Sequence, residues 1–229
     1  MSSIQELTDT KKRFVEFLRH GSNGVVYDLG NNTCLKKIFN RKNINSDDEH
    51  SYVIDTMSKL PLHNFCKLLE VFHEDNKVTG YLMKKYQEED LNILYIAKDY
   101  LLDSYRYLYS DMLTLAENYI CVDDFKPSNV FITINGIVAY DFDLYTKKVS
   151  KENARILNIA RLNIMFNELL KVELLTKSHS DYNEEYLRQI DNLFNAQTNI
   201  DSLEAQLIDF NRIIDYMRGL HGENRRHHQ

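Results

Sequence analysis

The chain of 229 residues contains only two prolines, seven glycines and three cysteines, and it has no tryptophan. With so little proline and glycine, it has no low-complexity linker, and no internal repeat divides it. Cys34, Cys66 and Cys121 are isolated from one another and from histidines at zinc-binding spacing. We therefore expect three reduced core thiols of an intracellular protein, without disulfides or a zinc site.

Long apolar runs and basic stripes are also missing. No run approaches the length of a membrane span, and the first residues lack a signal-peptide pattern. The net charge is −6, and the aromatic residues are 15 Tyr and 11 Phe. We expect no nucleic-acid surface and no membrane attachment, and a length that suits one compact unit with a sizeable core.

The most informative segment is Asp-Phe-Lys-Pro-Ser-Asn-Val-Phe, residues 124–131, which Tyr-Asp-Phe-Asp follows at 140–143. Its acid Asp124 can accept a proton from an attacking hydroxyl, and Lys126 can neutralise a phosphoryl group in transit. Side-chain oxygens of Asn129 and Asp141 are hard ligands of the kind that Mg²⁺ prefers. These four residues together predict a site that binds a magnesium nucleotide and promotes attack of a hydroxyl on its phosphoryl group.

The residues between these two oxygens predict a β-hairpin. Residues 130–134 and 137–140 are rich in β-branched and aromatic side chains, and Asn135-Gly136 between them is a strong two-residue turn signal. Such a hairpin carries Asn129 and Asp141 side by side at its open end.

Together these segments resemble the catalytic loop and metal-binding motif of the protein-kinase superfamily, D-[LF]-K-P-x-N followed by D-F-G. The resemblance implies ATP and Mg²⁺ as cofactors, Asp124 as the catalytic base, and Lys126 as the residue that stabilises the transferred γ-phosphoryl group. It also implies that Asn129 and Asp141 hold the metal.

Three positions depart from the family pattern. Val122 and Asp123 replace the usual His-Arg, and the missing Arg commonly grips a phosphorylated activation loop, so we expect no loop-phosphorylation switch. Asp143 replaces the Gly of the metal motif, as in small-molecule kinases that resemble the aminoglycoside and choline enzymes. Lys126, in contrast, resembles protein Ser/Thr kinases.

A nucleotide-binding lobe is expected upstream. Residues 14–18 and 24–29 predict two strands, and the segment between and after them resembles the second half of the kinase glycine-rich loop. Gly21 and Gly24 match its second and third glycines, where backbone N–H groups approach phosphates. Val26 matches the valine that covers adenine.

The next predicted strand, 33–39, carries two neighbouring lysines. Lys36 matches the phosphate-binding lysine of the family's Ala-Ile-Lys motif, while Lys37 lies on the opposite face of a strand with period two. We favour Lys36, and expect it to hold the α- and β-phosphates.

A helix after Ser46 should bring a carboxylate to Lys36, because Ser46 and the acids that follow it form an N-cap and an acidic first turn. Glu49 is the predicted partner, on a stripe with Val53, Met57 and Leu60; Asp55 is the alternative. Strands at 65–72 and 79–86 should follow, with a hinge against adenine at 83–87.

The remainder is predicted to be helical, over 101–119, 153–172, 183–194 and 200–220. Helix 153–172 has apolar residues on nearly all sides, which predicts a buried helix. The resemblance covers residues 14–145, and the later residues carry no family signature.

We therefore predict an α+β, two-lobed protein-kinase-like fold. Residues 1–86 would form a small antiparallel β lobe with one helix, and residues 87–229 a reduced, mainly helical lobe with the catalytic loop. The predicted function is a minimal, atypical protein Ser/Thr kinase, similar to small bacterial effector kinases, that phosphorylates a protein in the cytoplasm, or in a host cytosol. A small-molecule kinase and an inactive, partner-binding pseudokinase are the alternatives.

Overall fold

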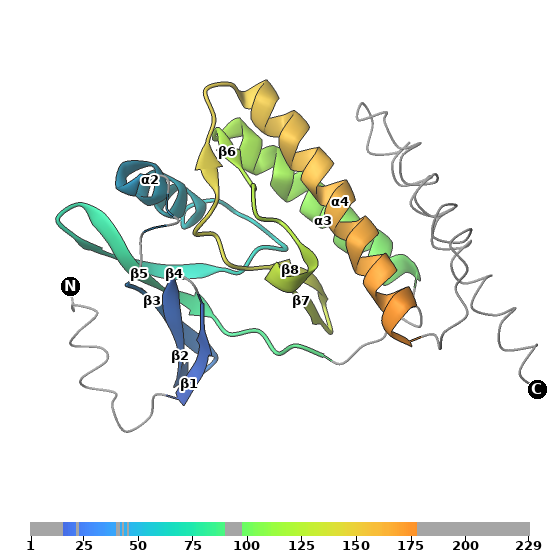
Figure 1. Ribbon diagram of the computed structural model, residues 1–229, viewed down its shortest axis with the longest axis horizontal. Coiled ribbons are helices and arrows are strands. Elements are labelled where there is room, and N and C mark those ends of the chain that lie inside the picture. Colours follow the sequence, from blue (N-terminus) through green and yellow to red (C-terminus); the bar gives the residue numbers. More distant parts are fainter. Residues whose placement is uncertain are drawn as a thin grey trace, which may run out of the picture.

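The structure, a computed structural model, describes residues 16–21, 23–39, 42, 44, 46–89 and 98–177. Its first part is an antiparallel five-stranded sheet in the spatial order β1-β2-β3-β5-β4 (Figure 1). These strands are β1 Glu16–His20, β2 Gly24–Gly30, β3 Thr33–Ile38, β4 Leu68–Glu74 and β5 Lys77–Lys84. All five predicted strands are present, with ends that shift by a few residues.

Two tight turns join neighbouring strands of this sheet. Asn31 and Asn32 connect β2 to β3, and Asp75 and Asn76 connect β4 to β5, all with φ between 50° and 63°. Hairpins with two turn residues at positive φ match the twist of the strands, and Asn and Asp tolerate this backbone better than other non-glycine residues. The local sequence thus fixes the strand pairing.

Helix α2, Asp47–Met57, lies against the sheet. Its N-cap is Ser46, whose hydroxyl accepts a hydrogen bond from the Glu49 backbone N–H at 3.1 Å, as the sequence predicts. The face turned to the core carries His50, Val53, Ile54 and Met57, at the spacing of one helix face.

The second part combines two long helices with short strands (Figure 1). Its elements are α3 Lys98–Glu117, β6 Ile120–Cys121, the 3₁₀ turn η1 Pro127–Asn129, β7 Val130–Thr133, β8 Gly136–Ala139, β9 Thr146–Lys147 and α4 Lys151–Lys177. Strand β6 pairs with β9, and β7 pairs with β8. The predicted helices at 183–194 and 200–220 lie outside the described residues.

The β7–β8 hairpin is present, but its turn is one residue earlier than predicted. Thr133 pairs with Gly136, so that Ile134 and Asn135 form the turn and Gly136 begins β8 at φ 140°. An added Cβ at Gly136 would lie 3.2 Å from the Asn64 side chain. Close packing and a backbone angle that favours glycine therefore place Gly136 in the strand.

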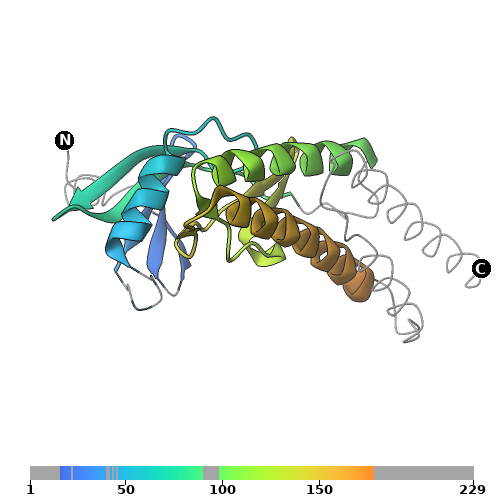
Figure 2. The same cartoon turned by 90° about the horizontal axis from the view of Figure 1, so that it is seen from above.

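Helices α3 and α4 run side by side along the second part (Figure 2). Helix α4 is not buried on all sides as predicted. Its buried face includes Ile159, Leu162 and Phe166, whereas Ile156 and Ile164 are exposed. The prediction was wrong because α4 has apolar residues on two faces, and α3 covers only one of these faces.

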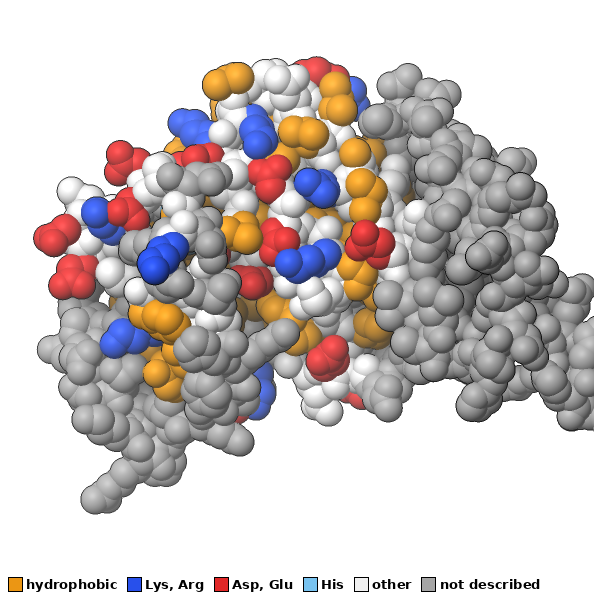
Figure 3. Space-filling view, viewed as in Figure 1, with side chains coloured by type: hydrophobic (Ala, Val, Ile, Leu, Met, Phe, Trp, Pro, Cys, Tyr) orange, Lys and Arg blue, Asp and Glu red, His pale blue; other side chains and the backbone are white. Residues whose placement is uncertain are grey.

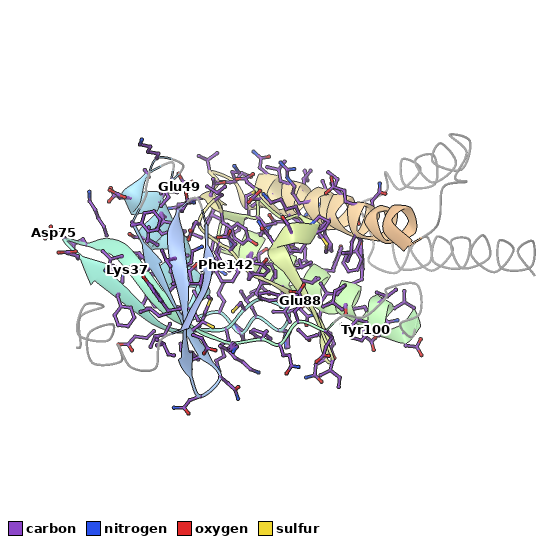
Figure 4. The ribbon with its side chains drawn as sticks, turned by 60° about the horizontal axis from the view of Figure 1, so that its bottom comes forward. Lys37, Glu49, Asp75, Glu88, Tyr100 and Phe142 are labelled. Carbon is purple, nitrogen blue, oxygen red and sulfur yellow. The ribbon has the colours of Figure 1, made fainter. Side chains whose placement is uncertain are left out.

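One hydrophobic core joins the two parts. Phe142 is fully buried, and its ring centroid is 6.2 Å from that of Phe65 and 6.5 Å from that of Tyr81. Figure 4 shows Phe142 between the sheet and the helices. The lobe boundary predicted at Tyr86 falls between β5 and α3, and the division into residues 1–86 and 87–229 stays a prediction.

Acidic and basic side chains are interspersed on the described part of the face in Figure 3. Apolar side chains lie between them, so the charges of the two signs do not separate into patches there. Within the described ranges, no helix is both long enough and apolar enough to cross a membrane.

Candidate active site

The segment between β6 and β7 gathers three of the predicted site residues. The ammonium group of Lys126 lies 2.8 and 3.0 Å from the two carboxylate oxygens of Asp124. The Asn129 side-chain nitrogen donates to the Asp124 carbonyl and to its Oδ2, both at 2.9 Å. Proline at the start of η1 has its φ already set for this turn. The loop therefore holds Asp124 from two sides.

The hairpin brings Asn129 and Asp141 together at its open end, as predicted. Val130 pairs with Ala139, and the Tyr140 backbone N–H donates to the Asn129 carbonyl at 2.9 Å. Asp141 has φ 67°, a left-handed conformation that is uncommon outside glycine. Asp143, which replaces the family's glycine, is not among the residues with positive φ. An acid at position 143 therefore causes no backbone strain.

Asn129 and Asp141 line a cavity between the sheet and the hairpin. The cavity is lined by Gly21, Gly24, Val26, Lys36, Tyr81, Met83, Asn129, Tyr140 and Asp141. Six of these are predicted site residues, and Met83 begins the predicted hinge. Tyr81 and Tyr140 are additions that the sequence did not single out.

The donor set at this cavity suits Mg²⁺. Asn129 uses its side-chain nitrogen for the hydrogen bonds to Asp124, which leaves the amide oxygen available, and the Asp141 carboxylate is 42% exposed. Mg²⁺ commonly takes one or two protein oxygens and completes its shell with water and phosphate. The described residues contain no group of three or more His, Cys, Asp or Glu that could hold a metal. A metal here would thus depend on nucleotide and water for its other ligands.

Lys36, and not Lys37, points into the cavity. Its Nζ lies 2.5 Å from Asp141 Oδ1 and 2.7 Å from Asp143 Oδ2, and the residue is 7% exposed. Burial lowers the pKa of Lys36, but Tyr81 and the two carboxylates raise it by more, so its pKa lies well above the usual range and the cation persists. Lys37 has intermediate exposure on the opposite face of β3 (Figure 4).

Comparison with curated proteins finds a relative that is described as a kinase. The chain is 26% identical over 166 residues to the probable serine/threonine-protein kinase MRK1 homolog of Encephalitozoon cuniculi (strain GB-M1). The match covers 67% of this chain and 50% of that protein, so the chain spans about half the length of this relative. No family model matches the chain.

Comparison of the fold also finds a similar solved structure. The chain is similar to the crystal structure of Rad53 1-466 in complex with AMP-PNP, with a TM-score of 0.59 and 15% identity over 87% of this chain and 64% of that chain. The chain therefore has a protein-kinase-like fold, and its sequence is similar to that of a protein described as a probable kinase. The predicted α+β, kinase-like fold is therefore confirmed.

The predicted ion pair of this kinase-like protein between Lys36 and Glu49 is wrong. Glu49 Oε1 instead accepts a hydrogen bond from the backbone N–H of Lys147 in β9 at 2.5 Å. The alternative Asp55 pairs with His73 at 3.1 Å. The reason is the rotation of α2, which turns His50 rather than Glu49 toward the core. Glu49 lies in the first turn of the helix (Figure 4).

The sequence analysis did not predict that Asp143, His50 and Tyr81 lie next to Lys36 or its partner. Asp143 is the second carboxylate on Lys36, and it is 1% exposed. The His50 Nε2 lies 3.6 Å from Asp143 Oδ1, and the Tyr81 hydroxyl donates to the same oxygen at 3.3 Å. The signal available in the sequence was that His50 shares the helical spacing of the apolar residues Val53, Ile54 and Met57.

The glycine-rich segment has a second explanation besides phosphate binding. A Cβ at Gly24 would lie 2.5 Å from the Lys37 carbonyl oxygen, so β2 and β3 approach closely only with glycine there. The Gly21 backbone N–H donates to the Gly24 carbonyl at 2.8 Å, which closes the turn. Gly24 is therefore required by packing whether or not a phosphate binds.

Asp123, in place of the family's Arg, contacts the segment after the metal motif. Its Oδ2 accepts hydrogen bonds from the Thr146 hydroxyl and from Lys148 Nζ. Its Oδ1 accepts from the Cys121 thiol at 3.3 Å. Asp123 thus connects the segment before the predicted catalytic base to residues 146–148.

Asn158 of α4 fixes the strand that leads to the catalytic loop. It is fully buried, its Oδ1 accepts from the Val122 N–H at 2.9 Å, and its nitrogen donates to the carbonyls of Ile120 at 2.9 Å and Met112 at 3.1 Å. Buried backbone groups need such partners. An asparagine within an apolar helix was the sequence signal for this role.

Proposed function

We propose that this chain transfers the γ-phosphoryl group of ATP, with Mg²⁺, to a Ser or Thr hydroxyl of a protein. One arrangement carries the proposal. Lys36, Asn129 and Asp141 line a single cavity, and Asn129 is hydrogen-bonded to Asp124, which pairs with Lys126. Cation, base and metal donors in one place are the parts that phosphoryl transfer requires.

Asp124 would orient the acceptor hydroxyl and take its proton. Its side chain is 25% exposed, so an acceptor can reach it from solvent. Lys126, at 2.8 and 3.0 Å from the two oxygens of that carboxylate, would lie next to the group in transit and neutralise part of its negative charge. Asn129 would keep the carboxylate aimed at the acceptor.

Lys36 would hold the α- and β-phosphates, while Asn129 and Asp141 would hold the metal. A magnesium ion bound by these two side-chain oxygens would neutralise part of the negative charge of the phosphates. Asp141 pairs with Lys36 in the structure, and its carboxylate is 42% exposed, so it would also be accessible to a metal. The backbone at φ 67° aims Asp141 into the cavity at a local cost.

Two observations bear on the acceptor. A protein acceptor is supported by the description of the Encephalitozoon relative as a probable Ser/Thr kinase and by Lys126. A small-molecule acceptor, the second candidate, is favoured by the short connection between Asp143 and the start of α4 at Lys151, which leaves little chain to support a peptide.

The experiment is phosphoryl transfer from labelled ATP, offered in parallel to a protein extract and to a panel of sugars, aminoglycosides and choline. Asp124→Asn should lower turnover about 10²–10⁴-fold, the usual loss when a general base is removed. The matched control is Asp103→Asn, because Asp103 pairs with Arg106 on the exposed surface of α3.

Label in serine or threonine of proteins supports the proposal, and label in the small-molecule panel alone supports the second candidate. Equal transfer by wild type and Asp124→Asn would contradict the assigned mechanism. Nucleotide binding without transfer to any acceptor would make the chain a binding protein of the pseudokinase kind.

A further inference from the structure

Lys36 lies between two carboxylates that differ sharply in their surroundings. Asp141 is 42% exposed and belongs to the proposed metal site, whereas Asp143 is 1% exposed and lies 2.7 Å from Lys36 Nζ. If Asp141 turns to a metal, Lys36 loses one of its two anions. Asp143 can keep its contact, because it faces the core and not the cavity opening.

Side chains from two other elements lie next to Asp143. His50 of α2 places Nε2 at 3.6 Å from Oδ1, and the Tyr81 hydroxyl of β5 donates to that oxygen at 3.3 Å, which leaves Oδ2 to Lys36. Burial, with Asp143 next in effect, raises the pKa of Tyr81 well above its usual range, so the phenol stays a neutral donor. Within the described residues, neither ring nitrogen of His50 makes a hydrogen bond, so Asp143 is the polar group that it meets.

We propose that Asp143 is the positioning residue for Lys36, that Tyr81 orients it by a hydrogen bond while His50 packs beside it, and that it replaces the helix carboxylate predicted at Glu49. This deepens, and rests on, the proposed phosphotransferase function. The metal motif would then supply both the metal ligand and the partner of the phosphate-binding lysine. Lys36 would then take its position from the segment 141–143 and not from a carboxylate on α2.

The decisive experiment moves the carboxylate to the helix. Asp143→Asn should lower kcat/KM for ATP about 10–100-fold, as loss of a supporting partner of a site residue typically does, mainly through a higher KM. His50→Glu combined with Asp143→Asn should recover most of the loss, because it restores a carboxylate beside Lys36. His50 lies 3.6 Å from Asp143, whose other oxygen contacts Lys36 Nζ at 2.7 Å. The control, His50→Gln with Asp143→Asn, has the same shape without the charge and should not recover.

A milder variant covers the case in which Asp143→Asn fails to fold. Tyr81→Phe removes one donor to Asp143 and keeps the ring, so it should raise the KM for ATP severalfold with a smaller effect on kcat. An unchanged KM in Tyr81→Phe would contradict the proposed orientation of Asp143.

Three results would overturn the inference. The first is a folded Asp143→Asn that matches an active wild type, which would leave the phosphotransferase function intact. The second is equal activity of the two double variants, in which His50→Glu or His50→Gln is combined with Asp143→Asn. The third, which needs no activity, is a double variant, Lys36→Met with Asp143→Asn, whose loss of unfolding free energy equals the sum of the losses in the two single variants. A true pair requires the double variant to lose less than the sum, because each single change leaves one buried charge without its partner.

Discussion

The carboxylate of Asp123 accepts a hydrogen bond from the ammonium group of Lys148 at 3.2 Å. This contact joins the residue directly before Asp124 to the residue directly after strand β9. The Thr146 hydroxyl donates to the same carboxylate oxygen, and β9 pairs with β6 beside it. The segment is therefore held by side chains of the chain itself, without a phosphate group.

The first prediction is that activity needs no upstream kinase. Protein that is purified without phosphorylation should transfer phosphate at once, and phosphatase treatment should leave its rate unchanged, because Asp123 already anchors Thr146 and Lys148. The measurement is the initial rate before and after phosphatase, with mass spectrometry of residues 143–150.

Thr146 gives this prediction a sharper form. A phosphate on its hydroxyl would stand against the Asp123 carboxylate, and like charges at contact distance repel. Thr146→Glu should therefore lower the rate, whereas Ser150→Glu, at the start of α4, should change it little. A protein that is inert until it is phosphorylated between Asp143 and Ser150 would contradict the prediction.

The second prediction concerns metal-dependent nucleotide binding. ATP should raise the melting temperature more with Mg²⁺ than with EDTA, and nucleotide at about 100 times its Kd adds about 2.7 kcal/mol. Asp141→Asn should remove most of the metal-dependent difference, since it removes the charge but tolerates the φ of 67°. Asp103→Asn is the control. An ATP shift that is equal with and without metal would argue against the site at Asn129 and Asp141.

The third prediction separates the two lysines of β3. Lys36→Met should weaken nucleotide binding and lower turnover, because its ammonium group is the buried cation at the cavity. Lys37→Met, the neighbour on the opposite face, should leave both close to wild type. Turnover and the ATP-induced shift in melting temperature measure the two effects, and similar losses in both variants would refute the assignment.

Much of the catalytic loop could be predicted from the sequence because its geometry is local. Asp124, Lys126 and Asn129 lie within six residues, and a short hairpin carries the chain back to Asp141. Strand alternation likewise predicts that Lys36 and Lys37 face opposite ways. Such patterns need no knowledge of distant packing.

The partner of Lys36 could not be predicted in the same way. Which helical residue faces the core depends on how α2 rotates against the sheet, and the packing of Val53 and Ile54 turns His50 inward in place of Glu49. Asp143 was interpreted as the loss of a glycine, because the sequence does not show that its carboxylate folds back onto a lysine 107 positions earlier. These relations are set by tertiary contacts.

The fourth prediction concerns the three cysteines. Burial, with smaller electrostatic contributions, raises the pKa of Cys34 to about 11 and those of Cys66 and Cys121 to about 12. Native protein at about pH 8 should therefore resist iodoacetamide, while protein unfolded in urea should react at all three thiols. Because these acids have raised pKa values in the fold, stability should be lost as pH rises from about 9 to about 12. Rapid alkylation of native protein would contradict the buried placement.

The last prediction tests the link between α4 and the catalytic loop. Asn158→Leu should destabilise the protein by roughly 3 kcal/mol or more, because each buried group that loses its partner costs about 1–3 kcal/mol and three backbone groups bond to this side chain. Turnover should fall as well, since Val122 lies two residues before Asp124. Urea unfolding measures the stability, and Asn153→Ala, exposed on the same helix, should change it by less than about 0.5 kcal/mol. A loss below about 1 kcal/mol in Asn158→Leu would mean that Asn158 does not hold the strand before the catalytic loop.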